Sequence, residues 1–193
     1  MNRTFSFLRV MIIALVGLGF TSCDEDIVTG SGLRGLWQGE MYVSGEYGGA
    51  TYLSSYTQIE FLGEGTNVTR GTGYWMDRYS RAPWDYFYSP FTYHVRDGVI
   101  TITLLYDGEV YTISDYSLYG SSFVGYLNES DERFELTKVS DQGDWGGYQP
   151  GWYSPYDDYY ARPESDFGSR SKKSVPTPVR RVWNKAAYER MEE

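Results

Sequence analysis

Apolar and polar residues alternate with a period of two along much of this chain, and two Asp-Gly pairs interrupt the alternation. Asp97-Gly98 and Asp107-Gly108 each stand between two alternating runs. Alternation of this kind is typical of a strand with one buried face, and Asp-Gly tolerates the positive φ angles of a two-residue hairpin turn. The segment Val95–Ile113 is therefore predicted to form three antiparallel strands joined by tight turns.

The same pattern extends over residues 34–139 and predicts about eight sequential strands with no helix between them. A row of strands with free edges invites aggregation, so a meander of this size must close or be covered. The predicted fold class is all-β, an up-and-down antiparallel barrel of about eight strands. The residues predicted for its core are Trp37, Phe61, Tyr93, Ile102 and Phe123.

Three short runs resemble the lipocalin-like domains of Bacteroidetes lipoproteins. They are Gly35-Leu36-Trp37-Gln38-Gly39, Phe123-Val124-Gly125-Tyr126-Leu127 and Phe134-Glu135-Leu136. The resemblance implies that Trp37 packs across the closed end of the barrel as a structural residue. Eight strands make a barrel just wide enough to be filled by side chains or to hold one small ligand, and both alternatives stay open here.

The first 22 residues have the layout of a secretory signal peptide. Arg3 and Arg9 precede an apolar run, Val10–Phe20, which is too short to span a bilayer and is followed by small residues. The segment Phe20-Thr21-Ser22-Cys23 resembles the lipobox of bacterial lipoproteins, which implies that Cys23 becomes the lipidated N-terminus of an envelope protein at the outer membrane. The alternative is a free or buried thiol after an ordinary signal peptide.

Residues 23–33 are predicted to be the lipidated N-terminus and a polar linker. Asp24-Glu25-Asp26 resembles the export signal that sends Bacteroidetes lipoproteins to the cell surface, and the alternative is the start of a solvated linker. Ten residues extend over about 35 Å at most. The folded part is therefore expected to lie close to the membrane.

A tail over residues 140–193 differs in composition from the barrel. It opens with Gly, Pro and aromatic residues and has no period, which predicts irregular structure. Thr177-Pro178 has the form of a helix start, with Thr as N-cap and Pro at the first helical position. A short helix is therefore predicted over residues 178–191.

Composition excludes several classes of function. A net charge of −9 without basic runs is unsuited to nucleic-acid binding. One cysteine excludes an intrachain disulfide or a CxxC zinc site. No catalytic motif is present, so the protein is predicted to be no enzyme and to use no cofactor or metal. The residues that a hydrolase, the remaining enzymatic alternative, would use are His94 and the carboxylates Glu40, Glu60, Asp77, Asp85 and Asp115.

The segment 74–88 is rich in aromatic residues and is predicted to be a long connection at the barrel mouth. The predicted ligand-binding residues are Trp75, Trp84, Tyr86 and Tyr88. The first functional hypothesis is a small apolar or amphipathic ligand bound inside the barrel beneath these rings. The alternative is a surface module that binds a glycan or another envelope protein through segment 74–88 and the tail. A structural alternative for the rings of 74–88 is that they cap the barrel as a lid or a satellite core. A large cavity would favour the first hypothesis, and a filled core with exposed Trp the second.

Overall fold

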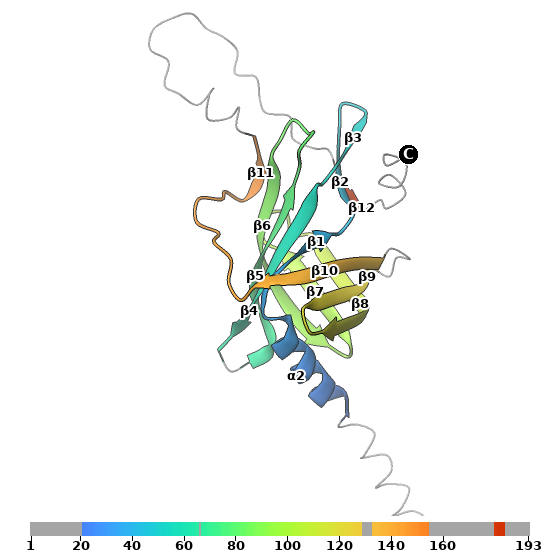
Figure 1. Ribbon diagram of the computed structural model, residues 1–193, viewed down its shortest axis with the longest axis vertical. Helices are drawn as coiled ribbons and strands as arrows, with labels where there is room; N and C mark the ends of the chain where they lie inside the picture. Colours follow the sequence, from blue (N-terminus) through green and yellow to red (C-terminus); the bar gives the residue numbers. More distant parts are fainter. Residues whose placement is uncertain (1–20, 66, 129–132, 155–179, 184–193) are drawn as a thin grey trace, which may run out of the picture.

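A closed barrel of eight antiparallel strands forms the body of the computed structural model, which describes residues 21–65, 67–128, 133–154 and 180–183 (Figure 1). Each barrel strand pairs with the next along the chain, and the last returns to the first with Gly39 opposite Leu136. The predicted fold class is confirmed. The barrel strands are β1 (Gly35–Glu40), β4 (Tyr56–Glu64), β5 (Asn67–Arg78), β6 (Tyr86–Arg96), β7 (Val99–Leu104), β8 (Val110–Tyr119), β9 (Ser122–Leu127) and β10 (Arg133–Ser140).

The two Asp-Gly pairs form turns of different lengths. Asp97 and Gly98 have φ angles of 52° and 73° and join β6 to β7 as the predicted two-residue turn. Around Asp107-Gly108 the connection is wider, because β7 ends at Leu104 and β8 begins at Val110. The amide of Gly108 donates to the carbonyl of Leu104 at 3.1 Å, which closes this wider turn.

A second, three-stranded sheet stands at one end of the barrel and contains the order β12-β2-β3. The hairpin β2 (Val43–Tyr47) and β3 (Ala50–Leu53) is inserted between β1 and β4. Tyr42, which lies between β1 and β2, has a φ of 54°, and the chain leaves the barrel wall at this point.

The helix predicted over 178–191 is wrong at Arg180–Trp183, which form strand β12. β12 pairs antiparallel with β2 in register from Arg180 opposite Glu46 to Trp183 opposite Val43. The edge of β2 offers ladder hydrogen bonds that a local N-cap pattern does not reveal. The rest of the predicted helix lies outside the described residues.

The tail also contributes β11 (Gly151–Tyr153), a strand where irregular structure was predicted. It pairs with the first residues of β6, from Tyr86 to Tyr88. The later part of β6, from Phe91 to Arg96, pairs with β7 and closes the barrel. β6 is therefore shared between the barrel and an extension of its wall.

The expected linker is a helix, α2 (Thr21–Leu33), which lies at the opposite end of the barrel from the β2–β3 hairpin (Figure 1). The Asp26 carboxylate accepts hydrogen bonds from the amides of Asp97 (3.1 Å) and Gly98 (3.2 Å). These contacts hold the segment against the barrel, so it does not extend freely. No helix within the described ranges is long and apolar enough to cross a membrane. Residues 1–20 of the predicted signal peptide lie outside them.

Aromatic rings fill the barrel. Phe61 packs edge-to-face on Phe91 (centroids 5.4 Å apart) and Tyr93 (5.1 Å), and Trp37 packs on Phe123 (5.5 Å). Glycines make room for the rings, because a Cβ at Gly73 would lie 2.3 Å from the Phe91 ring. All residues predicted for the core are buried, namely Trp37, Phe61, Tyr93, Ile102 and Phe123.

Candidate functional site

The four predicted ligand-binding residues do not form one cluster at a barrel mouth. β5 runs to Arg78 and β6 begins at Tyr86, so the connection is only residues 79–85. Trp75 and Trp84 are completely buried in the main core. Tyr86 and Tyr88 belong to a separate cluster on the outer face of the same wall. The prediction of one long connection over 74–88 is therefore wrong, because the strand ladder continues through most of the segment.

Trp84 is the centre of a second group of rings above the barrel. Its ring packs against Tyr52 (5.3 Å between centroids), Tyr79 (5.7 Å) and Trp152 (5.1 Å). These rings come from β3, the connection 79–85 and β11. They extend the core toward the β2–β3 hairpin, which makes Trp84 a packing residue in this structure.

Among the residues that the structure describes, the side chains in the middle of the barrel are packed against one another. Any side chain that lined a space large enough for water would carry accessible area, and Phe61, Trp75 and Phe123 carry none. Aliphatic neighbours at the same level, including Ile102 and Ile113, are equally inaccessible. The barrel thus follows the filled alternative for an eight-stranded barrel.

An outer aromatic cluster lies on the outside of β5 and β6. Successive strand residues point to opposite faces, so Tyr74 and Tyr88 face outward while Trp75 faces inward. Trp145 lies over both tyrosines, at 5.3 Å from the Tyr74 ring and 5.7 Å from the Tyr88 ring, and is nearly parallel to Tyr88 (20°). The cluster consists of Tyr74, Met76, Tyr86, Tyr88, Trp145, Tyr148 and Tyr153.

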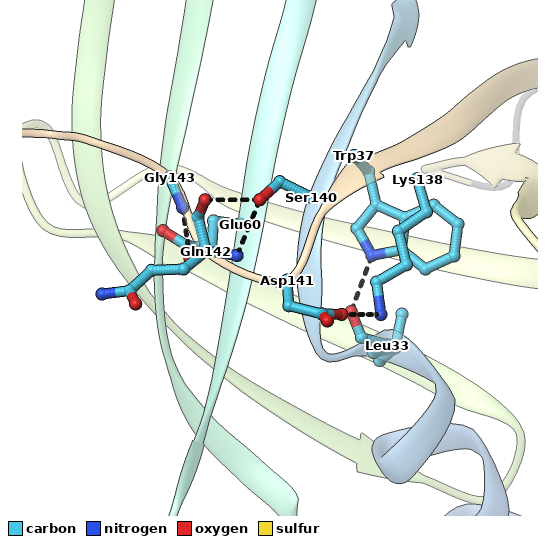
Figure 2. Close-up of polar contacts among 8 residues, drawn as sticks. All are labelled: Leu33, Trp37, Glu60, Lys138, Ser140, Asp141, Gln142 and Gly143. Carbon is cyan, nitrogen blue, oxygen red and sulfur yellow. Dashed lines mark hydrogen bonds and ion pairs between the residues drawn. The ribbon is translucent and has the colours of Figure 1, made fainter.

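A buried carboxylate fixes the position of Trp145. Glu60 is 1% exposed although it lies on the outer face of β4. Its carboxylate accepts a hydrogen bond from the amide of Gly143 at 2.9 Å (Figure 2). It also accepts a hydrogen bond from the indole nitrogen of Trp145. Burying a charge is costly unless it is hydrogen-bonded, and these donors supply that compensation.

The segment that carries Trp145 is also held where it leaves β10. Ser140 Oγ donates to the carbonyl of Gln142 at 2.8 Å, and Lys138 forms an ion pair with Asp141 at 2.8 Å (Figure 2). The hydrogen bond and ion pair with Lys138 lower the pKa of the Asp141 carboxyl. The start of the tail is therefore a strap bound to the barrel wall.

A surface depression of about 370 Å³ lies beside this strap. Its lining combines aromatic rings with polar side chains, among them Gln142 and Glu60. Burial, with smaller contributions from Tyr74 and Tyr86, raises the pKa of Tyr88 to about 12, so its phenol is neutral at physiological pH. The lining residues are Glu60, Leu62, Tyr74, Tyr88, Gln142, Gly143, Trp145 and Gly146.

A guanidinium group borders the cluster on its other side. Arg78 donates to the Tyr148 hydroxyl at 2.7 Å and lies 5.4 Å from the Tyr86 ring centroid and 5.3 Å from that of Tyr148. Cation–π contacts of this kind stabilise a partly desolvated cation. The rings of the outer cluster are thus fixed by a cation at one end and a carboxylate at the other.

The residues that a hydrolase would use are dispersed. Asp77 lies inside the barrel, where it accepts from Thr57 Oγ1 (2.7 Å) and Trp75 Nε1 (2.9 Å), whereas Glu60 lies outside. His94 is exposed on β6, opposite Arg70 of β5. In the part of the chain that is described, no three His, Cys, Asp or Glu residues gather as a metal site. Glu40, Asp85 and Asp115 are exposed.

Sequence reasoning named Tyr86 and Tyr88 but neither Trp145 nor Glu60 as binding residues. The strand alternation places Tyr74 and Tyr88 on the outer face of the barrel, and these large rings on the solvent side were the feature of the sequence that indicated a covering segment. Comparison with protein-family models, with curated protein sequences and with solved structures found no match. The architecture itself defines the class as a closed antiparallel β-barrel with an aromatic cluster on its outer wall.

Proposed function

We propose that this protein is a non-enzymatic, lipid-anchored envelope lipoprotein that binds carbohydrate at the outer aromatic cluster. The observation that carries the proposal is the half-buried Trp145 ring, which is stacked on two tyrosines and beside a depression of about 370 Å³. The ring packs on the tyrosines and still keeps part of its area exposed to solvent. A preformed aromatic surface with a few polar groups is a common form of small-molecule site.

The chemistry of the depression suits a sugar. The apolar C–H face of a pyranose packs on an aromatic ring, while its hydroxyls need hydrogen-bond partners. Gln142 is exposed at the rim and offers both a donor and an acceptor. Because Glu60 and the tyrosines hold Trp145 in place before a ligand arrives, little side-chain entropy is lost on binding.

The filled interior supports a site on the outside in preference to one within the barrel. An apolar ligand in the interior would have to displace rings such as Phe61 and Phe123, which have no accessible area. Displacing a core aromatic side chain is comparable to deleting it and costs about 3–5 kcal/mol. We therefore favour the surface module over the carrier that binds its ligand inside the barrel.

Anchoring at Cys23 is the second part of the proposal and rests on the lipobox-like sequence Phe20-Thr21-Ser22-Cys23. Stable anchoring requires at least two acyl chains, and a lipoprotein cysteine carries several. α2 places Cys23 ten residues before Leu33, which is about 15 Å along a helix. The outer membrane is the location that we propose.

A glycan array probed with the wild-type protein and with Trp145→Ala tests the carbohydrate proposal. We expect the wild type to retain at least one glycan class and Trp145→Ala to weaken that binding about tenfold or more. Trp145→Phe keeps a ring but removes the donor to Glu60, so it should retain part of the binding. Tyr106→Ala, an exposed ring at the β7–β8 turn, is the matched control.

Two results would contradict the proposal. One is equal binding by the wild type and Trp145→Ala, and the other is retention of no glycan at all. Native mass spectrometry of the protein extracted from its source examines the carrier alternative. A reproducible extra mass beyond the acyl groups would support a ligand inside the barrel.

A further inference from the structure

Helix α2 exposes the apolar pair Ile27 and Val28 and packs the polar residues Asp26 and Thr29 against the barrel, while Leu33 at its end is buried in the core. Asp26 and Thr29 are buried against the barrel, at 8% and 7% exposure, whereas Ile27 and Val28 are 47% and 71% exposed. A helix on the surface of a globular protein normally shows the opposite arrangement, with an apolar stripe facing the core. The exposed pair Ile27 and Val28, which lies between the exposed polar residues Glu25 and Ser31, therefore suits the boundary between an apolar medium and water.

The orientation of α2 is fixed by its contacts with the barrel. Asp26 accepts from both amides of the β6–β7 turn, and the Tyr116 hydroxyl hydrogen-bonds with Thr29 at 3.2 Å. Gly30 lies directly on β5, since a Cβ there would be 1.9 Å from the carbonyl oxygen of Val68. The helix cannot rotate to bury Ile27 and Val28 without losing these contacts.

A second element exposes a large side chain at the same end of the barrel. Tyr119, the last residue of β8, is 86% exposed. Its neighbour Leu118 is close to α2, because a Cβ at Gly32 would lie 3.4 Å from the Leu118 side chain. Tyrosine is enriched at membrane interfaces, where its ring meets lipid and its hydroxyl meets water.

We propose that the outward face of α2, together with Tyr119, inserts into the interfacial layer of the membrane that carries the lipid anchor. This inference rests on the proposed anchoring at Cys23. Ile27 follows Cys23 by four residues, which is about one helical turn or 6 Å, so the apolar pair lies within reach of the same bilayer. The other exposed apolar residues near the β7–β8 turn, including Tyr106 and Val110, lie at the opposite end.

The consequence is a fixed orientation of the barrel on the membrane. The α2 end faces the bilayer, and the β2–β3 hairpin points away from it (Figure 1). An anchor on a flexible linker would instead let every face of the barrel meet the lipid. The contact adds buried apolar area to that of the acyl chains and restricts the rotation of the barrel relative to the membrane.

Photo-crosslinking from diazirine-bearing phospholipids tests this orientation on the full-length protein in membranes prepared from its source. Peptide mass mapping then locates the crosslinked residues. We expect crosslinks at Ile27, Val28 and Tyr119, and at least tenfold fewer at Tyr106, which is 48% exposed at the other end. Val28→Gln should lower the yield at Tyr119 several-fold.

Val110→Gln, the same change at a residue that is 56% exposed near the opposite end, should leave the yield at Tyr119 unchanged. Equal crosslinking of Tyr106 and Tyr119, or membrane-bound protein with no crosslinks in α2, would overturn the inference. Absence of the protein from the membrane fraction would overturn the anchoring as well. Failure of the glycan array with intact crosslinking would refute carbohydrate binding alone.

Discussion

Replacing Trp37 with alanine removes a residue that joins the barrel core to α2. The side chain is 1% exposed, and its ring packs on Phe123 with centroids 5.5 Å apart. Its indole nitrogen donates to the carbonyl of Leu33 at 2.7 Å. Truncation of a core Trp to Ala costs about 3–5 kcal/mol, and an unpaired buried carbonyl adds about 1 kcal/mol. We expect the free energy of unfolding to fall by about 4–6 kcal/mol.

Urea unfolding followed by far-ultraviolet circular dichroism measures this change without relying on tryptophan fluorescence. In a thermal scan the same loss corresponds to a decrease in Tm of roughly 10–20 °C for a domain of this size. Trp37→Phe keeps most of the ring but not the hydrogen bond to Leu33, so it should cost about 1–2 kcal/mol. A Trp37→Ala variant with the wild-type midpoint and slope would refute the assignment of Trp37 to the core.

Three further predictions use other contacts of the barrel. Gly73→Ala places a methyl group against the Phe91 ring and should destabilise the fold by about 1–3 kcal/mol, so an unchanged urea midpoint would refute the close packing. Asp26→Ala removes both hydrogen bonds to the β6–β7 turn, so amide hydrogen exchange at that turn should become faster and the free energy of unfolding should fall by about 2 kcal/mol. Unchanged exchange would show that α2 is not docked there. Burial raises the pKa of Tyr88 from 10.0 to about 12, so as the pH rises the Tyr88 hydroxyl is deprotonated in the unfolded chain before it is in the folded chain. The free energy of unfolding that is present below pH 10 should therefore decline as the pH rises toward 12. The decline in the urea midpoint should be smaller in Tyr88→Phe, and equal declines would exclude Tyr88 as its source.

The barrel was predictable because its signals are local. The alternation and the turn at Asp97-Gly98 each involve only a few neighbouring residues, and they specify strands and hairpins directly. α2 has no such signal, since most of its barrel-facing residues, Asp26, Thr29 and Gly30, are not apolar and only Leu33 at its end is. Its position depends on contacts with β5 and β6 that only the folded barrel creates. A helix of this composition therefore resembles a linker in the sequence.

The site was only partly predictable for a related reason. Tyr88 was named because it lies in an aromatic-rich segment, but Trp145 and Glu60 are separated by 85 residues and meet only after the barrel closes. β12 illustrates the same limit, because its pairing with β2 joins Trp183 to Val43. The local conformational propensity at these positions has less effect than the backbone hydrogen bonds offered by the open edge of a strand distant in sequence.

The ladder between β1 and β10, which closes the barrel, is expected to be the last part of the sheet to form. Leu36 pairs with Ser140, whereas the other barrel ladders join strands that follow one another along the chain. Closing a loop of about 100 residues costs about 4 kcal/mol of chain entropy, compared with about 2 kcal/mol for a ten-residue hairpin. Folding slows as contacts become more distant in sequence. We therefore expect the hairpins to form early and the β1–β10 ladder to form last. We therefore expect a chain that emerges from a ribosome to keep its barrel open until β10 has emerged, so that formation of the β1–β10 ladder marks the completion of folding.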